Sequence, residues 1–124
     1  MNKLTISIGS NSIDKVLQMS NCIAWLKENL KATIFSETYS SPAINGKDPE
    51  YLNAVAIALS EESHEDLVRQ FKAYEASCGR NSYSKKRGEI PIDIDIVIWN
   101  DNILRQKDYC QEYFKIGWKL INKQ

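Results

Sequence analysis

This chain of 124 residues has few of the features that mark specialised protein classes. Its three cysteines, Cys22, Cys78 and Cys110, are widely spaced and odd in number. They exclude a Cys-x-x-Cys metal site and fit reduced thiols in a cytoplasmic protein. No apolar run approaches the roughly 20 residues of a membrane span, and the N-terminus lacks a signal-peptide pattern. We therefore expect no disulfide framework and no membrane partner.

Neither sign of charge is in excess, because Lys+Arg and Asp+Glu number 16 each. This balance gives no support for a nucleic-acid partner. Hydrophobic residues make up 43% of the chain and aromatic residues 10%, as in an ordinary soluble globular protein. At this length the composition predicts one domain over residues 1–124, and we expect a monomer.

Hydrophobic spacing predicts four strands and three helices. The strands are expected at 3–8, 32–40, 51–59 and 90–99, and the helices at 12–30, 64–78 and 105–122. The order βαββαβ plus a C-terminal helix is typical of a ferredoxin-like α+β fold. We expect a four-stranded antiparallel sheet of strand order 4-1-3-2, with two helices on one face and the C-terminal segment on part of the other.

Two further patterns favour structural roles. The single histidine, His64, falls in the first turn of the second helix, so we expect a surface or capping residue there. In the C-terminal helix, aromatic and aliphatic residues recur at helical spacing and are expected to pack into the core. They are Tyr109, Tyr113, Ile116 and Leu120.

The strand IPIDIDIVIW (90–99) carries two aspartates within an apolar run. Because side chains alternate along a strand, Asp93 and Asp95 point to one face. The isoleucines at 92, 94, 96 and 98 are expected on the other, helix-covered face. Tyr51 and Asn53 of the preceding strand are expected on the aspartate face, which predicts a polar and acidic group on an otherwise apolar surface.

Two neighbouring carboxylates repel each other unless cations lie between them. One reading is a solvated face on which the aspartates pair with lysines. The other is a magnesium site, because Mg²⁺ takes one or two carboxylates and completes its shell with water and phosphate oxygens. A basic loop directly before the pair favours phosphate chemistry. Its cationic residues are Arg80, Lys85, Lys86 and Arg87.

Five short segments carry a resemblance to a known family. They are ISIGSN (6–11), SSPAI (40–44), YLNAV (51–55), Glu75 with Gly79-Arg80, and IDIDIVIW (92–99). In this series the chain resembles the 6-hydroxymethyl-7,8-dihydropterin pyrophosphokinases (2-amino-4-hydroxy-6-hydroxymethyldihydropteridine diphosphokinases). These folate-pathway enzymes transfer pyrophosphate from ATP to a pterin alcohol, and the resemblance implies a short, divergent member.

The resemblance implies roles for individual residues. Asp93 and Asp95 look like the ligands of two Mg²⁺ ions that bridge the phosphates of the co-substrate ATP, with Arg80 as a further catalytic residue. Tyr51 would stack on the pterin ring and Asn53 would bind its hydrogen-bonding edge. The implied pterin pocket comprises Ser41, Pro42, Ile44, Tyr51, Asn53 and either Phe114 or Tyr113. The implied ATP side comprises Glu75, Arg80, Lys86, Arg87 and Tyr109.

The chain also departs from the family pattern. An arginine expected shortly before the aspartate pair is Ile90, a loop tryptophan is replaced near Arg87, and a second loop arginine is Ser82. The histidine expected after the last strand corresponds to Asp108. Three functions therefore stay open: pyrophosphoryl transfer, a non-catalytic paralogue that binds pterin or nucleotide, and a ligand-free interaction module. An RNA-binding module is disfavoured by the zero net charge and the absence of an aromatic RNA-binding signature.

Overall fold

The computed structural model describes residues 1–122, apart from the side chain of Lys85. The strands are β1 (Asn2–Ser10), β2 (Lys31–Phe35), β3 (Tyr39–Ser41), β4 (Tyr51–Ser60), β5 (Asp93–Trp99) and β6 (Asn102–Ile103). The helices are α1 (Lys15–Asn29), α2 (His64–Ser77), α3 (Ser82–Lys86), α4 (Gln106–Tyr109) and α5 (Glu112–Asn122). Within the described residues no helix is both long and apolar enough to cross a membrane.

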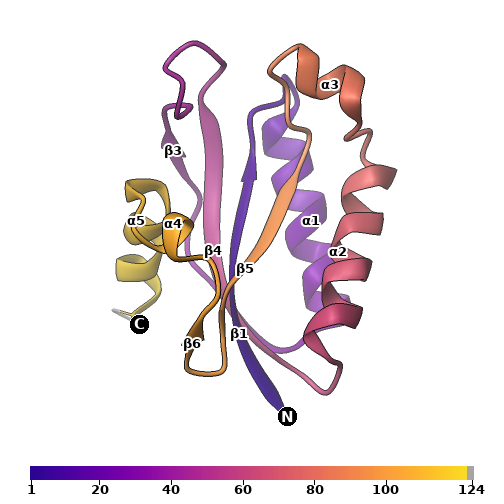
Figure 1. The fold of residues 1–124 in the computed structure, drawn as a ribbon, viewed down its shortest axis with the longest axis vertical. Coiled ribbons are helices and arrows are strands. Elements are labelled where there is room, and N and C mark those ends of the chain that lie inside the picture. The colour runs from indigo at the N-terminus through magenta and orange to yellow at the C-terminus, as the bar shows by residue number, and fades with distance from the viewer. Residues whose placement is uncertain (123–124) are drawn as a thin grey trace.

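The strands form one antiparallel sheet of order β2-β4-β1-β5-β6, and β3 pairs with β4 next to β2 (Figure 1). Its central part has the expected order 4-1-3-2, so the ferredoxin-like α+β prediction is confirmed. The expected second strand is divided into β2 and β3. At the division the Ser36 hydroxyl accepts a hydrogen bond from the Val55 backbone N–H at 3.0 Å, where a continuous strand would place a carbonyl.

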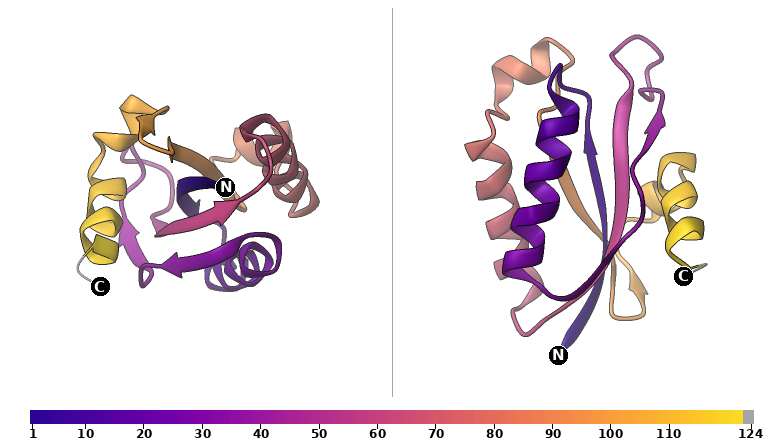
Figure 2. Two further views of the ribbon diagram at one scale, coloured as in Figure 1. Left: turned by 90° about the horizontal axis from the view of Figure 1, so that it is seen from below. Right: turned by 180° about the vertical axis from the view of Figure 1, so that it is seen from behind.

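The first core lies between the sheet and helices α1 and α2, which cover the same face (Figure 2). Alternate residues of the three central strands fill it, together with Ile92 directly before β5. The strand residues are Leu4, Ile6, Ile8, Ala54, Ala56, Ala58, Ile94 and Ile96. The alanines of β4 leave room for the large residues of the helices. The Ser63 side chain caps α2 by accepting from the Asp66 N–H, as the sequence predicts.

The second core lies under α5, which covers part of the opposite face. It consists of Val55 and Val97 from the sheet with Phe114 and Ile121 from the helix. Gly117 lies directly against Val55 and Tyr39, where a Cβ atom would collide with both side chains. The absence of a side chain there lets α5 approach the sheet closely.

Two sequence-based predictions about these faces are correct only in part, since Tyr109 and Tyr113 pack against the second core but Ile116 does not, and Ile98 leaves the face of the other isoleucines. The expected C-terminal helix is broken between α4 and α5, so its buried face consists of Phe114, Gly117 and Ile121, while Ile116 is exposed. The pairing of β1 with β5 also shifts register between Thr5 and Ile6. This bulge inserts an extra residue and turns Ile98 to the aspartate face, where it packs on the second core.

Candidate active site

A cavity of about 410 Å³ lies on the aspartate face of the sheet, beside the region that α5 covers. This volume is in the usual range for small-molecule sites. Eight residues singled out from the sequence line it: Ser41, Pro42, Ile44, Tyr51, Asn53, Asp93, Asp95 and Tyr113. The structure therefore brings together residues from β3, β4, β5, α5 and the loop after β3.

The floor of this cavity is made of small residues of the central strand. Gly9 lies opposite Asn53 on one side and opposite Asp93 on the other, and Ser7 lies opposite Asp95. A Cβ atom at Gly9 would lie 3.1 Å from Asn53 Oδ1 and 3.5 Å from Tyr51 Cδ1. The glycine therefore leaves open the space between the polar wall of β4 and the acidic wall of β5.

The polar wall is fixed by a hydrogen bond between neighbouring strands. Asn53 is buried, and its Nδ2 donates to Ser41 Oγ at 2.7 Å and, more weakly, to the Tyr39 carbonyl at 3.4 Å. The carboxamide is thus held in one orientation, with its oxygen directed toward Gly9. A held amide next to an aromatic ring suits a flat heterocycle that presents donors and acceptors along one edge.

The two aspartates differ in environment. The Asp95 side chain is 14% exposed and that of Asp93 is 34% exposed. Burial, reinforced by the negative charge of Asp93, raises the pKa of Asp95 to about 7. Arg105 opposes this rise. Asp95 therefore carries an unfavourable charge at neutral pH, which a bound cation would relieve.

Asp93 is held by a buried carboxylate and an arginine. Arg80 Nη1 lies 2.6 Å from Asp93 Oδ1 and 3.0 Å from Glu75 Oε1. Glu75, at the end of α2, is buried and accepts a hydrogen bond from the Ile94 backbone N–H at 2.8 Å. Glu75 thereby joins α2 to the edge of β5, and Arg80 fixes the position of the Asp93 carboxylate.

Arg105 is the main site residue that sequence reasoning missed. It lines the cavity together with Asp108 and Tyr113. The guanidinium pairs with the Asp108 carboxylate, which also accepts a hydrogen bond from the Tyr113 hydroxyl. Burial raises the pKa of Tyr113, so its hydroxyl stays protonated as a donor. The turn residues Asn100-Asp101 between β5 and β6 could have indicated that the chain turns back and brings Arg105 beside the aspartates.

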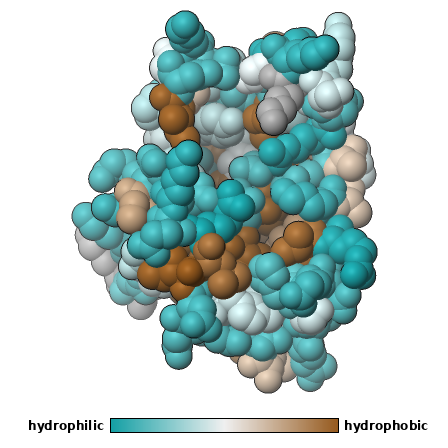
Figure 3. Space-filling view, in the orientation of Figure 1, coloured by the Kyte–Doolittle hydropathy of each residue, from teal (hydrophilic) through white to brown (hydrophobic). Residues whose placement is uncertain are grey.

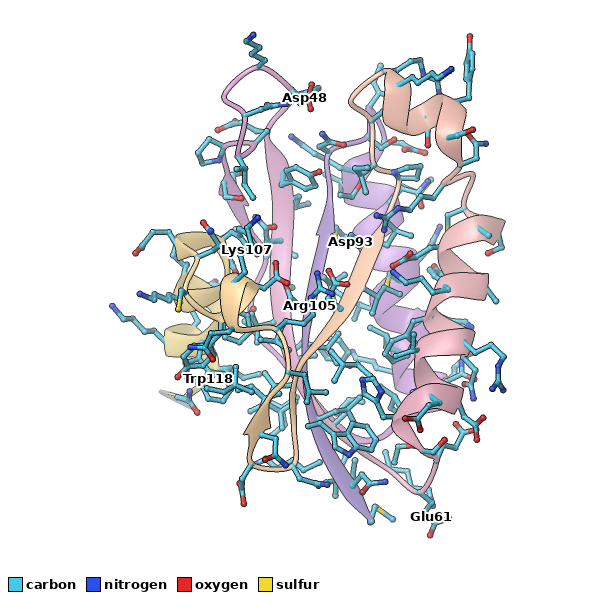
Figure 4. All side chains as sticks on the ribbon, in the orientation of Figure 1. Asp48, Glu61, Asp93, Arg105, Lys107 and Trp118 are labelled. Carbon is cyan, nitrogen blue, oxygen red and sulfur yellow. The ribbon has the colours of Figure 1, made fainter. Side chains whose placement is uncertain are left out.

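A second cavity of about 380 Å³ lies between α2 and β5. Asp95 and Arg105 line both cavities, so the two meet at these residues. The second is lined otherwise by His64, Val68, Phe71, Lys72, Ile94, Ile96 and Leu104. Figure 3 shows a band of hydrophobic residues just below the middle of the molecule. Figure 4, in the same orientation, shows Asp93 and Arg105 near the centre of the view.

Several residues singled out from the sequence lie elsewhere. Phe114 is fully buried in the second core, and Tyr109 packs beside it with ring centroids 5.7 Å apart. Tyr113 takes the place at the cavity instead. Lys86 and Arg87 are exposed, and Arg87 lies over the ring of Tyr83. The expected phosphate role of the Lys85 side chain falls outside the described residues.

His64 is the first residue of α2, as the sequence predicts. Its ring packs edge-on against Trp99, with centroids 5.4 Å apart, and it lines the second cavity. It is therefore nearer to the candidate site than its position in the sequence indicates.

The donor set of the site fits magnesium held jointly with a ligand. Within the described residues, no group of three or more histidine, cysteine or acidic side chains forms a metal cluster. Asp93 and Asp95 offer hard oxygen donors on one face, and Mg²⁺ is commonly bound by one or two carboxylates plus substrate phosphates. Two carboxylates are thus sufficient on the protein's side.

Comparisons with known proteins identify the family of the chain. The family model described as 7,8-dihydro-6-hydroxymethylpterin-pyrophosphokinase matches residues 5–121. The chain is 31% identical over 107 residues to a folate synthesis bifunctional protein of Chlamydia trachomatis, covering 81% of this chain and 24% of that protein. It is 30% identical over 103 residues to a 2-amino-4-hydroxy-6-hydroxymethyldihydropteridine pyrophosphokinase of Aquifex aeolicus, covering 82% of this chain and 64% of that protein. The chain thus spans less than two thirds of either relative.

Proposed function

The chain belongs to the 7,8-dihydro-6-hydroxymethylpterin-pyrophosphokinase family, and we propose that it transfers pyrophosphate from MgATP to 6-hydroxymethyl-7,8-dihydropterin, releasing AMP. One observation carries the proposal. A cavity of suitable size has a held carboxamide on one wall and two neighbouring carboxylates on the other. That arrangement can orient a flat heterocycle and a metal-bound polyphosphate toward each other.

The pterin would occupy the first cavity. Asn53, fixed by Ser41, would bind the amide-like edge of the ring, and Tyr51 would stack on its face. Tyr113 is the aromatic residue from the C-terminal segment that could contact the ring from the other side. The hydroxymethyl group would then point toward Asp93 and Asp95.

ATP would occupy the second cavity and place its phosphates where the two cavities meet. Val68, Ile96 and Leu104 offer an apolar surface for the base. Lys72 and Arg105 supply positive charge next to Asp95. The contact between Arg105 and Asp95 would put a cation beside the reacting phosphates, in a chain that has Ile90 where the family resemblance leads us to expect an arginine.

Asp93 and Asp95 are the residues that would hold two magnesium ions. Magnesium bound there would neutralise phosphate charge and so favour attack on phosphorus. Arg80 would keep Asp93 in position, because Arg80 Nη1 lies 2.6 Å from the Asp93 carboxylate. The raised pKa of Asp95 fits a site in which the cation arrives with the nucleotide.

In the proposed reaction the hydroxymethyl oxygen attacks the β-phosphorus of ATP. A bond forms between this oxygen and the β-phosphorus, and the bond from the β-phosphorus to the oxygen bridging to the α-phosphorus breaks. AMP leaves with the electron pair of that bond, and the hydroxyl proton is released to water. The protein contributes mainly by positioning the two substrates and by stabilising charge.

The test is pterin-dependent formation of AMP by the purified protein with ATP and Mg²⁺. A non-catalytic paralogue is the second candidate, favoured by Ile90 and by the outward position of Lys86 and Arg87. Such a protein would bind both substrates without forming AMP. A protein that binds neither substrate would contradict both proposals.

A further inference from the structure

The second cavity, between α2 and β5, is charged at one end. Among the described residues that line it, three carry charged side chains, namely Lys72, Asp95 and Arg105. Arg105 Nη1 lies 3.8 Å from Asp95 Oδ1, and the charge of Lys72 also acts on Asp95. These three side chains therefore form one charged end, which the proposed function assigns to the phosphates of ATP.

His64 lies at the opposite end of the same cavity. Its ring packs edge-on against Trp99, which follows Asp95 by four residues in β5, or roughly 13 Å along a strand. His64 also precedes Lys72 by eight residues in α2, or roughly 12 Å along a helix. The strand and the helix thus place the imidazole at a similar distance from the charged end.

The wall between the two ends is apolar. It is formed by the side chains of Val68, Phe71, Ile94, Ile96 and Leu104. Such a wall can contact the face of a flat ring, but its side chains cannot bind the polar edge of that ring.

His64 is the hydrogen-bonding side chain that the described residues offer at the apolar end. It lies one helical turn before Val68, so both side chains project from the same side of α2. The imidazole is 34% exposed, and its Nδ1 lies 4.0 Å from Glu65 Oε1, which is too far for a hydrogen bond. This contact therefore leaves the imidazole able to bind a ligand.

Resting on the proposed function, we propose that His64 is a specificity-determining residue that binds the base of the nucleotide. A nucleoside triphosphate with its phosphates at the charged end would extend along the apolar wall and present the edge of its base to His64. A neutral imidazole has one donor and one acceptor for that edge. His64 thereby lets the cavity distinguish a nucleotide from a phosphate compound that has no base.

The test compares the affinity for MgATP with that for ribose 5-triphosphate and Mg²⁺, a ligand that has the sugar and phosphates of ATP but no base. His64→Phe keeps an aromatic ring against Trp99 and removes the ring nitrogens. We expect its affinity for MgATP to fall by about 3–10-fold, the usual effect of one lost hydrogen bond. Its affinity for ribose 5-triphosphate should stay unchanged. His64→Gln, which keeps a donor and an acceptor, should retain most of the affinity for MgATP.

Arg69→Ala is the matched control in the same helix, because Arg69 forms an exposed ion pair with Asp66. It should bind both ligands as the wild type does. A purely structural role of His64 would lower both affinities together in His64→Phe, and that result would overturn the inference. So would unchanged affinity of His64→Phe for MgATP, equal losses in the Phe and Gln variants, or a wild type that binds both ligands equally well. A wild type that binds neither ligand would instead contradict the proposed function.

Discussion

Arg105 Nη1 lies 3.8 Å from Asp95 Oδ1, and these two residues line both the cavity on the aspartate face and the cavity between α2 and β5. The contact arises because the chain turns back after β5, with Asn100 in a left-handed conformation at φ 54°. β6 then pairs with the end of β5 and brings Arg105 beside the aspartates. A cation and an anion thus share the point at which two substrates would meet.

The first prediction concerns Arg105. Arg105→Ala should lower kcat by about 10²–10³-fold, the usual cost of losing a group that stabilises developing charge. Arg105→Lys should retain part of the activity. Arg69→Ala is the control, since Arg69 forms an exposed pair with Asp66. Steady-state kinetics would decide, and an Arg105→Ala variant with unchanged kcat would remove Arg105 from the reaction.

The second prediction concerns the polar wall of the first cavity. Asn53→Ala should weaken pterin binding by about 1–3 kcal/mol, because the ring edge and Ser41 both lose a hydrogen-bond partner. Affinity for MgATP should be nearly unchanged. Titration calorimetry would measure the affinity for each ligand. Asn29→Ala is the control, because Asn29 is exposed and its amide donates to the Trp25 carbonyl in α1. Equal loss of the two ligands would point to general disruption.

The third prediction is a pH dependence of stability in the free protein. The pKa of Asp95 is raised to about 7 from 3.8, so between these values the folded state keeps a proton that the unfolded state has released. The Asp95 contribution to stability therefore falls as pH rises from about 4 to about 7 and stays low above that. The Asp95→Asn variant does not undergo this loss. Its free energy of unfolding at neutral pH should therefore exceed that of the wild type by roughly 2–4 kcal/mol.

Denaturant unfolding of the metal-free protein at a series of pH values would measure the difference. The two proteins should have nearly equal stability near pH 4 and should diverge toward pH 7. A wild type as stable as Asp95→Asn at pH 7 would show that Arg105 fully compensates the buried charge.

The fourth prediction separates a metal site from a structural ion pair. The double variant Asp93→Asn/Asp95→Asn should unfold at the same temperature as the wild type or higher, because Arg80 keeps Glu75 as a partner and the repulsion is gone. The rise in melting temperature that MgATP gives the wild type should disappear. Destabilisation of the double variant together with an intact MgATP shift would assign the aspartates to the fold.

Much of this arrangement could be predicted from the sequence because local patterns determine it. The two-residue period of β5 assigns Asp93 and Asp95 to one face, and the same rule places Tyr51 and Asn53 beside them. The alanines of β4 and the cap at Ser63 predict where the helices pack. All of these signals depend on residues that lie only a few positions apart in the sequence.

The remainder depends on contacts between distant segments. The bulge that turns Ile98 to the aspartate face is a feature of the pairing with β1. The break between α4 and α5 shifts the helical phase by one residue, which buries Phe114 and brings Tyr113 to the cavity. Arg105 reaches Asp95 only because β6 pairs back on β5. No periodicity in the sequence encodes these three features.

The central claim is the transfer of two phosphoryl groups as a unit, and product analysis tests it most directly. The purified protein would be incubated with ATP, Mg²⁺ and 6-hydroxymethyl-7,8-dihydropterin. The products would be separated by chromatography, then identified and quantified by mass spectrometry. We predict AMP and a pterin diphosphate in equal amounts, formed by the wild type and lost in Asp93→Asn/Asp95→Asn. Binding of both substrates with no AMP formed, or ADP formed in place of AMP, would contradict the account.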